Sequence, residues 1–173
     1  MKLILIMALT VDGKIAKEAG QLADWTSPED KKSFIELTKD SGVIIMGNST
    51  YQTIGKPLPG RLNIVLTPEA NKFNSIPGKL EFFSGTPNEL LLSLKDRGFT
   101  KAILGGGAYT NKSFWELGLI DELILTIEPI VFGKGLNLFS DNNFEAKLKL
   151  LEVKALSNQT IRLHYQITKT PLK

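Results

Sequence analysis

Asp30 is the residue whose type and surroundings point most directly to chemistry in this sequence. It lies three residues after Ser27, and the apolar side chains of Trp25 and Phe34 stand on either side of it. A carboxyl group in apolar surroundings can donate a proton or bind a cationic ring nitrogen. The structural alternative is that Asp30 completes the cap of a helix that begins after Ser27, and the residues alone leave both interpretations open.

Two glycine turns predict a site for phosphate groups. Gly105, Gly106 and Gly107 follow an apolar run that ends at Leu104, and Gly47 ends another apolar run. A helical pattern follows each turn, and the unpaired N–H groups at a helix start favour phosphate. If the two strands are parallel, both turns lie at one edge of the sheet, where a dinucleotide could bridge them. The alternative is a tight turn with close packing of helix on strand.

The remaining reactive residues exclude several other chemistries. The sequence contains no cysteine and one histidine, His164, so thiol catalysis and a cysteine or histidine metal site are not supported. No second acid, histidine or cysteine is positioned to join Asp30, which argues against hydrolysis by paired carboxylates or a triad. We therefore expect no metal. One carboxylate beside a dinucleotide site is what hydride transfer to a protonated imine requires.

The elements that must position these residues follow an alternation of strands and helices. Apolar runs at residues 3–9, 42–46, 62–66, 80–83 and 100–104 predict strands, and most are followed by helical patterns. A further strand is expected at Glu122–Glu128. Two alternating runs at residues 148–156 and 160–168 predict an antiparallel hairpin. The fold class is therefore α/β, with a mostly parallel sheet covered by helices on both faces and an antiparallel C-terminal hairpin.

Length and charge set the remaining expectations. The 173 residues contain no linker or repeat, so we expect a single domain over residues 1–173. The net charge of +3 is dispersed among acidic residues, which does not support nucleic-acid binding. No stretch predicts a membrane-spanning segment or a cleaved signal, so a cytoplasmic protein is expected. Oligomeric state is not readable, and the apolar span of residues 130–138 is the candidate surface for a homodimer.

Five motifs resemble dihydrofolate reductase in order and spacing, over nearly the whole chain. They are Met7-Ala8-Leu9-Thr10-Val11-Asp12-Gly13-Lys14-Ile15-Ala16, Trp25-x-x-Pro28-x-Asp30, Ile45-Met46-Gly47-x-x-Thr50, Ile54-Gly55-Lys56-Pro57-Leu58-Pro59-Gly60-Arg61-x-Asn63 and Leu104-Gly105-Gly106-Gly107. The resemblance implies a three-layer fold around an eight-stranded mixed sheet, with NADPH across its carboxyl edge. It also implies reduction of 7,8-dihydrofolate to tetrahydrofolate, by hydride transfer to pterin C6 and protonation at N5.

The same resemblance implies roles for individual residues. Asp30 would bind the amino-nitrogen edge of the pterin and support protonation of N5, and Trp25 would shape the lid above it. The folate substrate would contact Phe34, Ile54, Leu58, Arg61 and Thr126, with Arg61 pairing with the glutamate tail. The cofactor would contact Ala8, Ile15, Gly47, Asn48, Ser49, Thr50, Thr67, Leu104, Gly105, Gly106, Gly107, Ala108 and Tyr109.

Two departures from the family pattern leave alternatives open. Asn48 and Ala108 occupy positions where basic residues would face the 2′-phosphate of NADPH, so NADH is not excluded. Residues 119–123 and 128–135 are more similar to the reductase domain of riboflavin biosynthesis, which reduces a ribosylaminopyrimidine phosphate. The set of Asp30, Arg61 and Thr126 favours dihydrofolate as substrate. The alternatives are the riboflavin-type reductase and a non-catalytic nucleotide-binding module.

Overall fold

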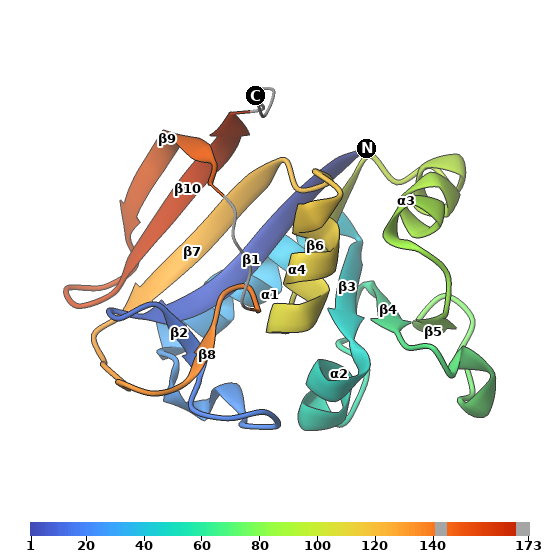
Figure 1. Ribbon diagram of the computed structural model, residues 1–173, viewed down its shortest axis with the longest axis horizontal. Coiled ribbons are helices and arrows are strands. Elements are labelled where there is room, and N and C mark those ends of the chain that lie inside the picture. The colour runs from blue at the N-terminus through green and yellow to red at the C-terminus, as the bar shows by residue number, and fades with distance from the viewer. Residues whose placement is uncertain (141–144, 169–173) are drawn as a thin grey trace.

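An eight-stranded sheet forms the centre of the computed structural model, which describes residues 1–140 and 145–168 (Figure 1). The strand order is β5-β4-β3-β6-β1-β7-β10-β9, and the pairs are parallel except those that β10 makes with β7 and β9. Its strands are β1 (Lys2–Thr10), β3 (Val43–Gly47), β4 (Leu62–Leu66), β5 (Leu80–Phe83), β6 (Lys101–Leu104), β7 (Glu122–Glu128), β9 (Lys147–Ala155) and β10 (Ile161–Thr168). The predicted α/β class, with its antiparallel C-terminal hairpin, is confirmed.

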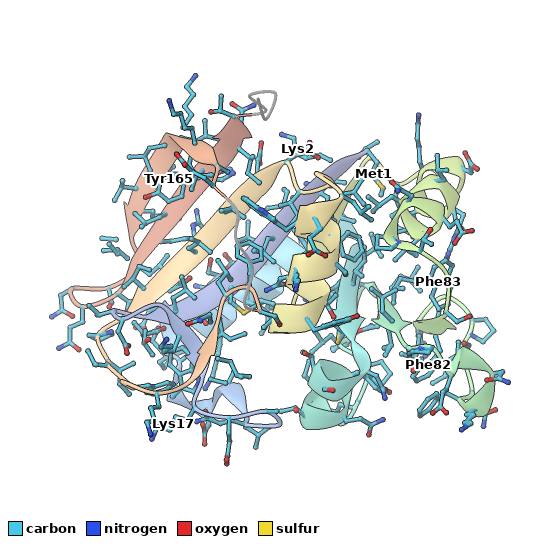
Figure 2. The ribbon with its side chains drawn as sticks, in the orientation of Figure 1. Met1, Lys2, Lys17, Phe82, Phe83 and Tyr165 are labelled. Atoms are coloured by element: carbon cyan, nitrogen blue, oxygen red, sulfur yellow. The ribbon has the colours of Figure 1, made fainter. Side chains whose placement is uncertain are left out.

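Helices cover both faces of this sheet, as Figure 1 shows for α4 in front and α1 behind. The helices are α1 (Pro28–Ser41), α2 (Asn48–Ile54), α3 (Pro87–Asp96) and α4 (Ala108–Glu116), with short 3-10 turns η1 (Ala23–Trp25) and η2 (Ala70–Lys72). Side chains of α3 and α4 pack on one hydrophobic cluster, and side chains of α1 and α2 pack on the other. Phe82 and Phe83, consecutive on β5, belong to the second and the first cluster respectively, as period-two alternation requires (Figure 2).

The start of α1 follows its sequence signals. Ser27 is the N-cap and its hydroxyl accepts the Asp30 N–H at 3.1 Å, Pro28 occupies the first turn, and Gly42 ends the helix with φ of 74°. The helix buries one face: Phe34 and Leu37 pack on the hydrophobic core, whereas Ile35 is 44% exposed because it lies outside that face.

A small second sheet was not predicted. Strands β2 (Lys14–Ala16) and β8 (Leu136–Asn137) pair antiparallel, joining the loop after β1 to the glycine-rich span after β7. The Asp12 carboxylate fixes the same junction by accepting the N–H groups of Phe132 and Gly133, at 3.2 and 2.8 Å. Residues 130–138, the candidate dimer surface, are therefore engaged in part by the chain's own N-terminal loop.

Among the described residues, no helix combines the length and apolar character that crossing a membrane requires.

Candidate active site

The two predicted glycine turns lie at the carboxyl edge of the sheet. Strands β1, β3, β6 and β7 run parallel, so their last residues lie at the same edge. The two glycine turns meet there, because the Gly47 N–H donates to the Gly106 carbonyl oxygen at 2.9 Å. The predicted juxtaposition of the two turns is therefore present in the structure.

The glycine turns leave bare backbone at this edge. A Cβ at Gly106, whose φ is +94°, would lie 2.6 Å from Met7 Cε, and a Cβ at Gly105 would lie 2.8 Å from Ile44 Cδ1. A Cβ at Gly47 would lie 2.5 Å from Thr110 Oγ1. Gly107 then begins α4 without a side-chain cap. A cradle without side chains, next to uncapped helix N–H groups, fits the diphosphate of a dinucleotide.

Other residues expected to contact the cofactor surround these turns. Asn48, Ser49 and Thr50 form the first turn of α2, and Ala108 and Tyr109 begin α4. Tyr109 is 79% exposed, and Thr50 Oγ1 would lie 3.2 Å from a Cβ on Gly107. The remaining members are Leu104, at the end of β6, Thr67, buried just after β4, Ala8 on β1 and Ile15 on β2. The cofactor contacts themselves stay predictions.

Asp30 is a buried carboxyl group at the same edge. It is 8% exposed, and the hydroxyl-bearing side chains of Thr126, on β7, and Thr26 lie close enough to stabilise its ionised form. Burial raises the pKa of Asp30 above its ordinary value, and the negative charge of Glu128 adds to this effect. The side chains of Thr126 and Thr26 oppose it by stabilising the ionised form. Asp30 can therefore hold a proton at higher pH than an exposed aspartate.

The alternative role of Asp30, completion of a capping box, is not what its side chain does. A capping box needs the third helical residue to accept the N–H of the N-cap residue. Here that N–H, on Ser27, donates to Glu128 Oε1 at 2.9 Å instead. The Asp30 backbone takes part in the cap, but its carboxyl group is free to face Thr126.

The expectation that no second acid would join Asp30 is wrong, because Glu128 lies close enough to act on its charge. Glu128 ends β7, is 3% exposed, and lies two residues after Thr126, so both side chains share one face of the strand. The same face also carries Glu122 and the core residue Ile124, so alternation places Glu128 beside Thr126 but does not distinguish it from a structural residue.

Three residues expected to line the substrate site lie on the face of the sheet that α1 and α2 cover. Phe34, Ile54 and Leu58 all pack on the second hydrophobic cluster. Asn63, fully buried, fixes the loop that carries Leu58: its Oδ1 accepts the Leu58 N–H and its Nδ2 donates to the Leu58 oxygen, both at 2.9 Å. The structure thus brings an apolar wall together, although substrate contact stays a prediction.

Arg61 is a buried cation beside that wall. Its Nε donates to the Pro59 carbonyl oxygen at 3.2 Å, and its Nη1 donates to the Ile35 carbonyl oxygen at 3.3 Å and to the Thr38 hydroxyl. Burial lowers the pKa of Arg61 from its usual value. The main-chain acceptors hold the guanidinium in one orientation between α1 and the start of β4, which suits recognition of an anion.

Trp25 lies at the entrance to this region. Its ring packs edge-on against Phe132, with centroids 5.1 Å apart, so the loop before α1 and the span after β7 touch each other. Trp25 is half-buried, and the next residue, Thr26, contacts Asp30. This placement agrees with a lid role for Trp25, which stays a prediction.

The C-terminal part of the chain matches a known family. Residues 60–162 match the RibD C-terminal domain. Among curated relatives, the uncharacterized protein YwjB of Bacillus subtilis is 28% identical over 172 residues, which cover 95% of this chain and 97% of YwjB. Dihydrofolate reductase of Haemophilus influenzae is 32% identical over 126 residues, which cover 73% of this chain and 71% of that enzyme.

Solved structures share the whole fold. A putative riboflavin biosynthesis protein from Shewanella sp. PV-4 aligns with a TM-score of 0.81 at 23% identity, over 98% of this chain and 100% of that one. Dihydrofolate reductase from Enterococcus faecalis, solved in complex with NADP(H) and RAB-propyl, aligns with a TM-score of 0.74 at 23% identity, over 97% of each chain. Identities of this size establish the fold alone.

These comparisons favour the riboflavin-type alternative over the dihydrofolate reductase that the motifs suggested first. The family match, to residues 60–162, covers more than half of the chain. The dihydrofolate reductases are related as well, so the resemblance at the motifs is genuine. The chain belongs to the RibD C-terminal domain family and has the dihydrofolate reductase-like fold.

Proposed function

We propose that this chain is a nicotinamide-dependent reductase whose substrate is a ribosylaminopyrimidine phosphate. The observation that carries the proposal is the buried Asp30 carboxyl group, beside Thr126 at the sheet edge where the two glycine turns meet. The RibD family match supports the choice of substrate class. The cofactor, when bound, supplies the hydride. The residues of the chain must bind the cofactor and the substrate, orient them, and protonate the substrate.

Asp30 would handle the proton. Because burial raises its pKa, the carboxyl group can remain protonated where an exposed aspartate is ionised. Its single O–H group can then donate to a ring or imine nitrogen of the substrate, which makes the neighbouring carbon more electrophilic. When the proton has moved, the neighbouring Thr126 and Thr26 side chains can stabilise the remaining carboxylate, since both favour its ionised form.

The other residues would orient the two reactants. Phe34, Ile54 and Leu58 provide an apolar wall for a flat heterocycle and exclude water from one side of it. Arg61 would bind the anionic end of the substrate, for which its fixed guanidinium is suited. The glycine cradle and the start of α4 would hold the cofactor diphosphate, and NADPH is the form expected first.

Dihydrofolate is the second candidate substrate, and a specific observation favours it. Asp30, Arg61 and Thr126, the residues that the resemblance assigns to folate binding, are all buried. The relationship to the H. influenzae enzyme supports the same set. A carboxylate tail and a phosphate are both anions, so Arg61 does not discriminate between the two substrates by charge alone.

The deciding experiment is oxidation of NADPH by the purified chain with each substrate in parallel. We expect turnover of the ribosylaminopyrimidine phosphate, little turnover of dihydrofolate, and loss of the rate in Asp30→Asn. Turnover of dihydrofolate alone, with inhibition by methotrexate, would establish the second candidate instead. Binding of NADPH without turnover of either substrate would contradict both and indicate a non-catalytic binding module.

A further inference from the structure

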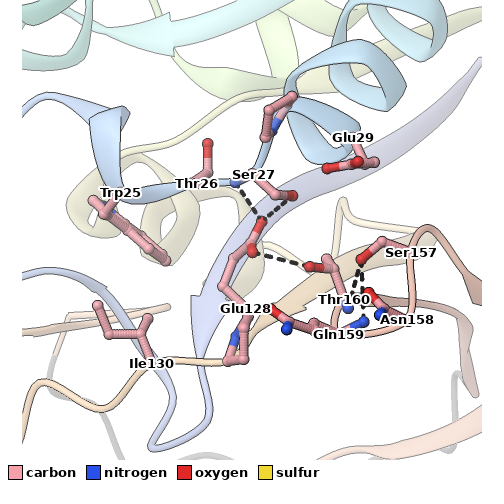
Figure 3. A pocket seen from close by; sticks show the side chains of 12 residues that line it. Trp25, Thr26, Ser27, Glu29, Glu128, Ile130, Ser157, Asn158, Gln159 and Thr160 are labelled. Atoms are coloured by element: carbon pink, nitrogen blue, oxygen red, sulfur yellow. Dashed lines mark hydrogen bonds between the residues drawn. The ribbon is translucent and has the colours of Figure 1, made fainter.

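Glu128 connects three segments that are distant in the sequence (Figure 3). Its Oε1 accepts the Ser27 N–H at 2.9 Å and the Ser27 hydroxyl at 2.8 Å. Its Oε2 accepts the Thr160 hydroxyl at 3.2 Å. One buried carboxylate thus joins the end of β7, the N-cap of α1 and the turn of the β9–β10 hairpin.

This arrangement bears directly on Asp30. The Ser27 hydroxyl donates to Glu128 and accepts the Asp30 N–H at 3.1 Å, so Glu128 reaches the Asp30 backbone through a single side chain. Glu128 also takes the Ser27 N–H, the group that the Asp30 carboxylate would accept in a capping box. Without Glu128, that donor would be open to Asp30, whose carboxyl group could then turn away from Thr126.

We propose that Glu128 is the positioning residue for Asp30, because it occupies the helix-cap donor and leaves the Asp30 carboxyl group facing the substrate side. The inference deepens the proposed reductase function and rests on it. Glu128 itself does not touch the reacting atoms in this account. It acts through Ser27 and through the charge that it places near Asp30.

The charges around Asp30 predict a second effect. Lys31 follows it on α1 and favours its ionised form, whereas Glu128 on β7 opposes ionisation. On β10, Arg162 contacts the next turn of α1, where its Nη1 donates to Ser33 Oγ at 2.9 Å. The Nη2 atom of Arg162 forms an ion pair with Glu152 Oε2 at 2.9 Å, which compensates the positive charge of Arg162. Glu128 is therefore the nearby carboxylate that disfavours a second negative charge.

A pocket that is open to solvent lies beside Glu128. It has a volume of about 480 Å³ and is lined by Trp25, Ser27, Glu29, Ile130 and the hairpin turn that carries Thr160. In Figure 3 the Glu128 side chain points from β7 toward Ser27 and Thr160, with Glu29 on the far side of the α1 start. Glu29 is exposed and shares this pocket, so it provides a matched control for removal of one negative charge.

The test compares Glu128→Gln, Glu128→Ala and the control Glu29→Gln in the intact chain. Glutamine can keep the bonds to Ser27 and Thr160 while removing the charge, because its oxygen accepts and its amide group can donate to the Thr160 hydroxyl. We expect the pH at which activity falls to decrease by roughly 0.5 to 1 pH unit in Glu128→Gln. In Glu128→Ala, kcat should fall roughly tenfold, while the Kd for NADPH stays within about twofold.

A second readout separates this inference from the proposed function. Carbon-13 NMR of the carboxyl groups, with the Asp30 signal assigned by Asp30→Asn, follows the titration of Asp30 without any turnover. The Asp30 signal should titrate at lower pH in Glu128→Gln than in wild type and Glu29→Gln. The positioning role is tested by Glu128→Ala, which removes the bonds to Ser27 as well as the charge: its Asp30 signal should titrate at lower pH than in Glu128→Gln, because the released Ser27 N–H can then stabilise the Asp30 carboxylate. If Glu128→Ala and Glu128→Gln titrate alike, the positioning role is wrong even if the reductase is active. If the two variants differ but no substrate is reduced, the proposed function is wrong and the positioning role stands.

Discussion

The two halves of the candidate site are built in different ways. The cofactor half, at Gly47 and Gly105–Gly107, consists of backbone: glycines at which an added Cβ would lie close to neighbouring side chains, and two turns joined by one main-chain hydrogen bond. The substrate half consists of side chains, with Asp30, Thr126 and Glu128 arriving from α1 and β7. A backbone site depends on local conformation, whereas a side-chain site depends on tertiary contacts. Changes in the two halves should therefore affect different measurable quantities.

The largest difference between the effect on rate and the effect on cofactor affinity is expected for Asp30→Asn. This change removes the proton donor, so kcat should fall by roughly 10²- to 10⁴-fold. The Kd for NADPH should change little, because the glycine turns are untouched. Fluorescence titration with NADPH and steady-state rates measure the two effects, and a comparable loss of cofactor affinity would break the division between the halves.

The same variant has a predicted effect on stability. The folded-state pKa of Asp30 is raised, so ionisation disfavours the fold, and stability decreases as pH rises from the unfolded pKa to the folded pKa. At neutral pH this cost is present in wild type and absent in Asp30→Asn. Thermal unfolding at neutral and acidic pH should show that the stability of Asp30→Asn increases relative to that of wild type as pH rises. An equal difference at both pH values would contradict the raised pKa.

Arg61 should affect the substrate and not the cofactor. Arg61→Met removes a charge-assisted contact of about 1.5–3 kcal/mol, so KM for an anionic substrate should rise roughly 10- to 100-fold. It also loses bonds to the Pro59 and Ile35 carbonyl oxygens, so folding must be verified by circular dichroism. Arg97→Met serves as the control, since Arg97 pairs with Glu81 at the surface. An unchanged KM would remove Arg61 from the substrate site.

Gly106→Ala tests the cofactor half. Its φ of +94° disfavours any side chain, and the new Cβ would meet Met7 Cε. We expect the Kd for NADPH to rise about tenfold, from strain of roughly 1–3 kcal/mol at the turn. Gly118→Ala is the matched control, because Gly118 also has positive φ but nothing within 4 Å of the added Cβ. Equal effects on cofactor affinity in both variants would contradict a local cradle.

The smallest effect is expected at the helix starts. Asn48→Arg and Ala108→Arg place cations where the resemblance expects the 2′-phosphate, and an exposed ion pair contributes about 0.2–1 kcal/mol. The ratio of kcat/KM for NADPH to that for NADH should therefore rise only severalfold. A ratio that stays constant in both variants would place the 2′-phosphate elsewhere.

The contrast between features set by local conformation and features set by tertiary contacts explains how much the sequence could predict. Strands such as Glu122–Glu128 and Leu80–Phe83 were predicted with their observed bounds, because apolar runs and turn residues are local signals. Gly47 and the three glycines that follow β6 were identified for the same reason. The pairing of β2 with β8 was missed, since a three-residue and a two-residue strand carry no periodicity. Glu128 was missed because its partners, Ser27 and Thr160, are far away in the sequence.

The pH dependence of reduction, measured with wild type and Asp30→Asn side by side, tests the central claim most directly. The protonated form of Asp30 is the active one in this account, and burial raises its pKa. The rate of NADPH oxidation with the ribosylaminopyrimidine phosphate should therefore be highest at low pH and fall as pH rises through that pKa. Asp30→Asn should retain a low rate without this transition. A wild-type rate that is absent, or that keeps the same pH profile in Asp30→Asn, would contradict the account.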